Sequence, residues 1–461
     1  MKRIVRSTIL AIALAIMATL TAGCVSAESR VSVYSEVDKP VVLAGGGERV
    51  VIKVGLKGLT MPVMPERIPM NLAIVLDRSG SMRQDDKIGN AKLGAIEIVE
   101  RLSPDDILSL VVYSDRPHVI LPARRVKDKA AIIEIISGVY AGGSTALYGG
   151  VAYGADQVRK NMSWEYINRI ILLSDGLANV GPSSTEALAD LGSMLEAEGI
   201  TVTTIGVGLD YNEDLMTSLA ANSGGNAYFA STGRELPAIF AEEIGEAMTL
   251  TARDIRIRID CPEGVRPVGV IGRHGEVSGR TMTVEVGKLY GKNEKFALFE
   301  IEVAGKEAGE SLEIARVDVE YADPLTNEKR SDRQSVSVAF DRSEEVVLEQ
   351  ENTEVTKQAV LTRASDAKRE AVALADKGDV GGAAAVMKKN ALELEKAAER
   401  CDNDDELLEE AKECEEISTD IESNTGFTKY QRKRVVNDAF TQSTQQGYVS
   451  EEDKDKDEDN K

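Results

Sequence analysis

Histidine is nearly absent from this chain, and its scarcity restricts the catalytic mechanisms available. Only 2 of the 461 residues are His. His118 falls on a predicted edge strand, and His274 falls in a predicted hairpin turn of a different domain. A serine hydrolase needs a general base beside its nucleophile, and two distant histidines do not provide one. The composition therefore favours a binding protein over an enzyme.

Cysteine is also sparse. The 4 cysteines of the chain are Cys24, Cys261, Cys401 and Cys414. Structural zinc sites usually contain closely spaced CxxC pairs, and none is present here, so such a site is disfavoured. A disulfide between Cys401 and Cys414 and two separate thiols are both compatible with the sequence.

Basic charge is in deficit. The chain has 55 Lys and Arg against 77 Asp and Glu, which gives a formal net charge of −22. Binding to a nucleic-acid backbone needs clustered Lys and Arg, so we expect no nucleic-acid partner. Acidity of this size keeps a protein soluble, and by itself it names no partner.

Long apolar runs are missing after the N-terminal segment. There, Lys2, Arg3 and Arg6 precede an apolar run from Thr8 to Leu20. This run is shorter than the roughly 18–20 residues that a membrane-spanning helix needs. A basic start, a short apolar run and small residues after it are typical of a secretory signal peptide, which we place at residues 1–27.

Two cleavage sites are compatible with this signal peptide. The sequence TAGC ends at Cys24 and resembles a bacterial lipoprotein box, although Thr21 stands where such boxes usually have Leu. Cleavage there would leave Cys24 acylated at the new N-terminus. The sequence VSA, ahead of Glu28, instead fits a small-x-small peptidase site. Either site predicts export to the cell surface, the periplasm or the medium, with membrane association only through a lipid on Cys24.

Alternating apolar and polar residues indicate strands in two separate parts of the chain. Residues 28–69 contain two or three strands and end in the proline-rich stretch MPVMPERIP, which is typical of a linker. Residues 250–342 contain five more strands. The first segment is too short to bury a core alone. We therefore predict that the two segments form one β-sandwich with another domain inserted between them.

Residues 70–249 have the pattern of an α/β domain. Continuous apolar runs such as NLAIVL, ILSLVVY and RIILLS suit strands that are buried on both faces. Amphipathic segments between them predict a doubly wound, mainly parallel sheet with helices on both faces, near residues 86–102, 127–139, 146–160, 184–198, 212–222 and 235–249. In such domains, ligands bind at the carboxyl ends of the strands.

The C-terminal part of the chain has no strand pattern. Residues 343–422 are helical and rich in charge, with a predicted helical hairpin around Gly378 and Asp379. Residues 423–461 are predicted to be a tail whose acidic end, EEDKDKDEDNK, is disordered.

Oxygen-bearing side chains gather at the predicted carboxyl ends of the strands. Asp77 ends one strand and is followed by Ser79 and Ser81 in the sequence DRSGS. Asp175 ends another strand, and Thr145 in YAGGSTALYGG precedes a helix. Parallel strands present these loops on one face, so the five side chains are able to converge. A set of oxygen donors alone suits Mg²⁺, Mn²⁺ or Ca²⁺ and disfavours zinc.

These residues resemble the metal-ion-dependent adhesion site of von Willebrand factor type A domains. Asp77, Ser79 and Ser81 match the DxSxS loop of that family, Thr145 its second-loop threonine and Asp175 its third-loop aspartate. The resemblance implies that the hydroxyls bind Mg²⁺ (or Mn²⁺ or Ca²⁺) directly, and that the two acids bind it directly or through water. It also implies a protein partner that offers an Asp or Glu carboxylate to the metal. Arg78, Arg83 and Lys87 are expected to make the rim of the site positive.

Each of these side chains also has an ordinary structural role open to it. Ser79, Ser81 and Thr145 can cap helices, and Asp175–Gly176 is a common turn pair. An aspartyl-phosphate enzyme would favour an acid two residues after Asp77, where this chain has Ser79. The full set of five in the right order favours the metal site, and no catalytic residues are predicted.

Two functions remain open from the sequence. The domain combination resembles exported prokaryotic proteins described as chloride-channel-regulator-like. The first hypothesis is an exported adhesion or scaffold protein that binds a protein partner through the metal. Alternatively, the chain is an accessory or assembly subunit of an envelope enzyme complex, and docks through its C-terminal helices.

Overall fold

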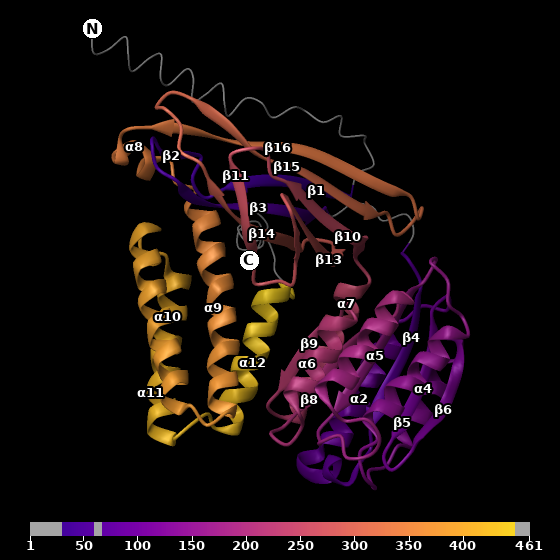
Figure 1. Cartoon of the computed structure of the whole chain (residues 1–461). Coiled ribbons are helices and arrows are strands. Elements are labelled where there is room, and N and C mark those ends of the chain that lie inside the picture. The colour runs from indigo at the N-terminus through magenta and orange to yellow at the C-terminus, as the bar shows by residue number, and fades with distance from the viewer. Residues whose placement is uncertain (1–29, 60–66, 448–461) are drawn as a thin grey trace, which may run out of the picture.

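The computed structural model describes residues 30–59 and 67–447 and divides into three parts (Figure 1). A β-sandwich, an α/β domain and a set of C-terminal helices lie next to one another. The predicted signal peptide with Cys24, most of the proline-rich stretch and the acidic end of the tail lie outside the described residues. Among the described residues, no helix has the length and apolar character needed to cross a bilayer.

The α/β domain is built on a six-stranded sheet with the strand order β6-β5-β4-β7-β8-β9. All neighbouring strands are parallel except β6, which runs antiparallel to β5 at the edge. The predicted doubly wound sheet is therefore confirmed. Its strands are β4 (Met70–Asp77), β5 (Ile107–Tyr113), β6 (Pro117–Arg125), β7 (Ile167–Ser174), β8 (Thr201–Val207) and β9 (Ala227–Ala230).

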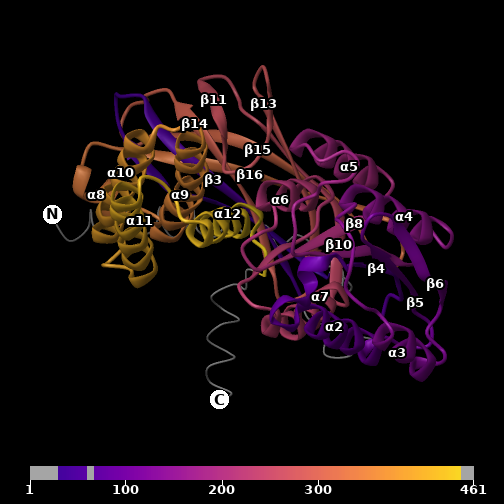
Figure 2. The same ribbon diagram turned by 90° about the horizontal axis from the view of Figure 1, so that it is seen from below.

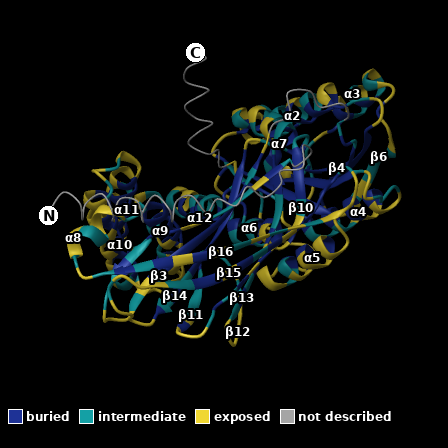
Figure 3. Cartoon of the chain, turned by 90° about the horizontal axis from the view of Figure 1, so that it is seen from above, coloured by how far each residue is buried: buried dark blue, intermediate teal, exposed yellow. Residues whose placement is uncertain are grey.

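Helices cover both faces of this sheet, which explains why its central strands are buried along their whole length (Figure 3). One core lies under α2 (Lys87–Arg101), α3 (Lys129–Ser137) and α7 (Leu236–Ala247). The other lies under α4 (Leu147–Arg159), α5 (Thr185–Ala197) and α6 (Glu213–Asn222). Gly154 allows α4 to approach the sheet closely, because a Cβ at this position would lie 2.7 Å from a methyl group of Val75.

The sandwich combines the two strand segments that flank the α/β domain. β3 (Glu48–Gly58) pairs along its whole length with β14 (Glu294–Val303), and β2 (Val41–Leu43) pairs with β16 (Lys329–Asp341). The two sheets have the orders β1-β3-β14-β11 and β12-β13-β10-β15-β16-β2 and enclose a shared apolar core. The remaining strands are β1 (Val31–Val37), β10 (Leu250–Asp260), β11 (Val265–Ile271), β12 (Glu276–Ser278), β13 (Thr281–Tyr290) and β15 (Ser311–Ala322).

The C-terminal helices are α8 (Glu344–Glu349), α9 (Thr353–Asp376), α10 (Val380–Arg400), α11 (Asp405–Asn424) and α12 (Lys429–Thr444). The predicted hairpin is present, with Gly378 at a positive φ of 84° and the side chain of Asp379 capping α10. α9 packs on the sandwich through Val355 and Ala359. Cys401 and Cys414 are both free thiols, so the disulfide open from the sequence is not formed.

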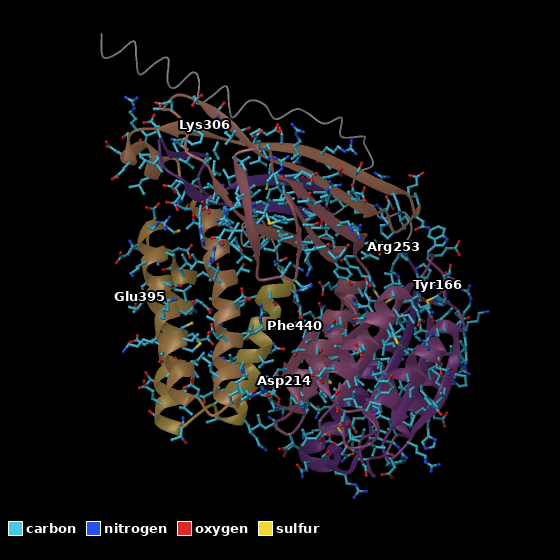
Figure 4. The ribbon with its side chains drawn as sticks, in the orientation of Figure 1. Tyr166, Asp214, Arg253, Lys306, Glu395 and Phe440 are labelled. Atoms are coloured by element: carbon cyan, nitrogen blue, oxygen red, sulfur yellow. The ribbon has the colours of Figure 1, made fainter. Side chains whose placement is uncertain are left out.

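α12 corrects the prediction of a tail over residues 423–461. It lies between α9 and α6 in both ribbon views (Figures 1 and 2). Arg432 donates to Asp214 of α6 and to Asp376 of α9, each at 2.7 Å, and Phe440 is buried against the α/β domain (Figure 4). The sequence of α12 contains few apolar residues, because ion pairs provide much of its contact with neighbouring helices.

A buried polar network joins the α/β domain to the sandwich. Arg169 of β7 forms a salt bridge with Glu243 of α7 and donates a hydrogen bond to Tyr290 of β13. The Arg169 and Glu243 side chains are 1% and 0% exposed. Glu243 accepts further hydrogen bonds from Thr203, Asn226 and Tyr228. These contacts lie where the parallel strands begin, so their carboxyl ends point away from the sandwich.

Lys288 lies at the same junction and gives the fold a specific pH dependence. Its Nζ donates a hydrogen bond to Thr201 Oγ1, at the start of β8. Burial, together with the nearby charge of Arg169, lowers the pKa of Lys288 to about 8. Between about pH 8 and its ordinary pKa near 10.5, the unfolded chain therefore binds more protons than the folded chain, and stability rises with pH.

We expect Lys288→Met to remove this part of the pH dependence. At pH 7 the variant should be more stable by about 2 kcal/mol, because the folded protein no longer holds a partly buried ammonium group. The difference from the natural chain should shrink as the pH rises to 10, and urea unfolding at each pH measures it. Lys389→Met, at a side chain 78% exposed on α10, is the control and should show no such trend. A constant difference across this range would contradict the assignment to Lys288.

Candidate metal centre

Asp77 ends the central strand β4 and is completely buried. Its Oδ1 accepts the backbone N–H of Ser79 at 2.8 Å, and its Oδ2 accepts the hydroxyl of Ser174 at 2.9 Å. Burial raises the pKa of Asp77 to about 6, although the hydrogen bonds from Ser79 act in the opposite direction. The carboxylate is thus fixed in direction and poorly solvated, and a bound cation would stabilise its charged form.

Ser79, Ser81 and Asp175 are in mutual contact. The two hydroxyl oxygens lie 3.0 Å apart. Asp175 Oδ1 accepts a hydrogen bond from Ser81 at 2.7 Å and a longer one from Ser79 at 3.4 Å. Asp175 follows β7, so side chains from the ends of two neighbouring strands meet as predicted.

Thr145 joins this cluster from the loop before α4. A Cβ placed on Gly176 would lie 3.2 Å from Thr145 Oγ1 and 3.8 Å from Ser81 Oγ. Both hydroxyls therefore face the space beside Gly176. The Thr145 backbone is fixed by Asn179, whose Oδ1 accepts the Thr145 N–H at 2.9 Å. The structure thus brings all five predicted residues to one end of the sheet.

Glycines allow the loops of the site to approach one another. The N–H of Gly80 donates to the carbonyl of Gly143 at 2.9 Å, and that of Gly142 donates to the carbonyl of Arg78. Gly143 has a φ of 95°, which favours glycine, and a Cβ there would lie 2.9 Å from Asp115 Oδ2. The GG pair in the second loop therefore serves loop geometry.

The donor set fits a hard divalent cation. It consists of two buried carboxylates and three hydroxyls, and oxygen is the donor that Mg²⁺, Mn²⁺ and Ca²⁺ prefer. The described residues contain no group of three or more His, Cys, Asp or Glu side chains placed to hold a metal. Hydroxyls are therefore needed to complete a site around Asp77 and Asp175.

Lys87 differs from the prediction that it belongs to a positive surface rim. It is the first residue of α2, and its side chain is 8% exposed. Its Nζ forms a salt bridge with Asp175 Oδ2 at 2.9 Å. Arg83 does remain at the surface, where its guanidinium donates to the carbonyl of Ala141. Neither Lys87 nor Ser174 was predicted as part of the cluster. The only sequence signal for their role is that each stands near a predicted site residue in the chain.

Exposed apolar side chains occur in the same set of strand-end loops as the metal centre. They stand in the loops after the strands, close in sequence to Gly142, Asp175 and Gly208. Tyr140 is 74% exposed, and the other members are Leu177, Val180 and Leu209. We call these four residues the apolar rim. Large apolar groups left in water beside a polar site are typical of a protein-binding surface.

Comparison with known families agrees with this doubly wound domain. Residues 71–242 match the model of the von Willebrand factor type A domain. The chain therefore contains a domain of this family, and such domains mediate protein–protein interactions and commonly hold a divalent metal.

Two similar proteins with a curated sequence are described as uncharacterized. One from Synechocystis is 25% identical over 272 residues, covering 57% of this chain and 64% of the relative. The protein YfbK of Escherichia coli is 28% identical over 215 residues, covering 46% of this chain and 37% of the relative. The chain thus matches less than two thirds of the length of either relative.

Two solved structures share the wider architecture. A von Willebrand factor type A protein from Catenulispora acidiphila has a TM-score of 0.63 at 18% identity, covering 83% of this chain and 89% of that chain. The ArnB paralog VWA2 from Sulfolobus acidocaldarius has a TM-score of 0.58 at 18% identity, covering 90% and 98%. The likeness at this identity concerns the fold, and it extends well beyond the α/β domain.

Proposed function

We propose that the chain is an exported adhesion or scaffold protein that binds a protein partner through a divalent metal ion. Asp77, Ser79, Ser81, Thr145 and Asp175 would hold Mg²⁺, or Mn²⁺ or Ca²⁺ in its place. The partner would supply an Asp or Glu carboxylate. The observation that carries this proposal is the meeting of two buried carboxylates and three hydroxyls from three separate loops.

The protein groups leave room for such a partner. Mg²⁺ takes six oxygen ligands. In the von Willebrand factor type A family, which this site resembles, the five side chains act partly through water. A coordination position is therefore left for an oxygen of the partner. The hydroxyls of Ser79, Ser81 and Thr145 are neutral. They therefore leave the positive charge of the cation available to an anionic ligand.

The apolar rim supports a protein as the ligand. Tyr140, Leu177, Val180 and Leu209 offer exposed apolar contact area in the strand-end loops. Protein interfaces combine a desolvated apolar region with a few directed polar contacts. A partner carboxylate flanked by apolar side chains would match both features.

The proposal is for a binding protein and not an enzyme. His118 is exposed on the edge strand β6, and His274 stands between β11 and β12 in the sandwich. Neither belongs to the loops that carry the five oxygen donors. The proposal of export rests on the sequence of residues 1–27.

Metal binding tests this function directly. We expect EDTA-treated, dialysed protein to bind one Mn²⁺ per chain in a calorimetric titration. The Mn²⁺-loaded chain, immobilised on a column, should retain proteins that EDTA then elutes. A chain that binds no Mn²⁺, or a column whose captured proteins are indifferent to EDTA, would contradict the proposal.

A further inference from the structure

Lys87 is a buried cation in direct contact with the candidate metal centre. It follows the DRSGS loop closely and begins α2, with its ammonium group turned inward. Its Nζ lies 2.9 Å from Asp175 Oδ2, and the Asp175 side chain is 0% exposed. Water therefore screens this ion pair only weakly.

The two oxygens of Asp175 have different partners. Oδ1 faces the hydroxyls of Ser79 and Ser81, and Oδ2 faces Lys87. A cation held by the hydroxyls would approach Asp175 from the Oδ1 side. Lys87 would then lie on the opposite side of the same carboxylate, close enough to repel the cation.

The fold makes space for the ammonium group. Gly208 follows β8 with a φ of 78°, and a Cβ there would lie 3.0 Å from Lys87 Nζ and 3.3 Å from Lys87 Cε. A residue with a side chain would strain the backbone at this φ and push against Lys87. The absence of a side chain at Gly208, in a second loop, thus leaves the space that Lys87 occupies.

The charges of the buried groups indicate what Lys87 does. A divalent cation brings two positive charges, and Asp77 with Asp175 brings two negative charges. Without Lys87, the formal charges of the loaded site would sum to zero, so its attraction for an anion would come only from the nearby cation and would be weaker. With Lys87 it carries one positive charge, which matches one carboxylate.

We propose that Lys87 sets the ligand preference of the metal centre. It lowers affinity for the metal and raises affinity of the loaded site for an anionic ligand. This inference rests on the proposed function, since it assumes a divalent cation held by Asp77 and Asp175. In this proposal, Lys87 touches neither the metal nor the partner. It acts through its contact with Asp175 and through its charge.

Neutral variants of Lys87 test the inference on metal binding. Lys87→Met and Lys87→Gln remove the charge with side chains of similar length. We expect both to bind Mn²⁺ about tenfold more tightly than the natural chain in calorimetry at one ionic strength. The control Lys92→Met removes a charge from the same helix, where Lys92 Nζ donates to the carbonyl of Ser137. It should leave Mn²⁺ affinity within about twofold.

Ligand preference is measured with acetate as the probe. A carboxylate that displaces water from bound Mn²⁺ lowers the enhancement of water-proton relaxation. We expect the Mn²⁺-loaded neutral variants to need about tenfold more acetate than the natural chain for the same decrease. Circular dichroism establishes that each variant is folded before titration.

The outcomes separate this inference from the proposed function. If the natural chain binds no Mn²⁺, the proposed function fails and this role of Lys87 fails with it. If the natural chain binds Mn²⁺ but the neutral variants bind it equally or more weakly, only the role of Lys87 is overturned. If the neutral variants bind Mn²⁺ more tightly but need the same acetate concentration as the natural chain, the proposed ligand preference is likewise overturned.

Discussion

Replacing Asp77 by Asn is expected to lower Mn²⁺ affinity at least about a hundredfold while the metal-free chain remains folded. The charge that the cation needs is removed. The amide can still accept the N–H of Ser79 through its oxygen and donate to the hydroxyl of Ser174. Because Asp77 is buried, loss of its charge also removes a desolvation cost in the metal-free state. Calorimetric Mn²⁺ titration and urea unfolding measure the two effects.

The matched control for this variant is Asp190→Asn, at an exposed position of α5. It makes the same change of charge and should leave Mn²⁺ affinity unchanged. On the affinity column described above, the Asp77→Asn chain should lose the proteins that EDTA elutes from the natural chain. Mn²⁺ binding retained by Asp77→Asn would place the metal elsewhere and contradict the proposed site.

Glu243→Ala is expected to lower the free energy of unfolding by about 3–5 kcal/mol. The substitution leaves the guanidinium of Arg169 buried without its carboxylate, and an unpaired buried charge is strongly destabilising. It also removes the shared acceptor of Thr203, Asn226 and Tyr228. Urea unfolding followed by circular dichroism measures the loss.

A surface ion pair supplies the comparison for Glu243. Glu198 forms a bidentate pair with Arg159, and both side chains are about one-third exposed. Glu198→Ala should cost less than about 1 kcal/mol, because water replaces the lost contacts. Similar losses in the two variants would show that the Arg169–Glu243 pair contributes no more than a surface contact.

The meeting of the five candidate residues at one end of the sheet could be predicted because each follows or precedes an element with a strong pattern. Asp77 and Asp175 end apolar runs that are buried on both faces of the sheet. The topology of a parallel sheet then places their loops at one edge, whatever the details of packing. Thr145 was predictable in the same way, as the residue just before an amphipathic helix.

The role of Lys87 could not be predicted from a pattern. A lysine at the first turn of a helix is ordinarily solvated, and its inward direction here depends on Asp175 and Gly208, which are distant in sequence. α12 was missed for a related reason. Its contacts use Arg432 and Lys433 with acids of other helices, and hydrophobic periodicity carries no information about such partners.

Two strands of the sandwich were also missed, for local reasons. β11 contains Pro267 and Gly269 at a register irregularity, which interrupts the alternation that identifies a strand. β12 is short and wholly exposed, so no buried face marks it. Neither affects the metal centre, which lies at the opposite end of the α/β domain.

The insertion of the α/β domain into the sandwich has a mechanical consequence. A pull on a partner bound at Asp77 would act along β4 and reach the sandwich by two connections, one leading from β3 and the other from α7 into β10. β3 lies between β1 and β14, and β10 lies between β13 and β15, in different sheets. Each anchoring strand is therefore held by backbone hydrogen bonds on both edges, and these bonds run across the strand and share the force in shear. Tension at the binding face would be divided between the two sheets before either could open.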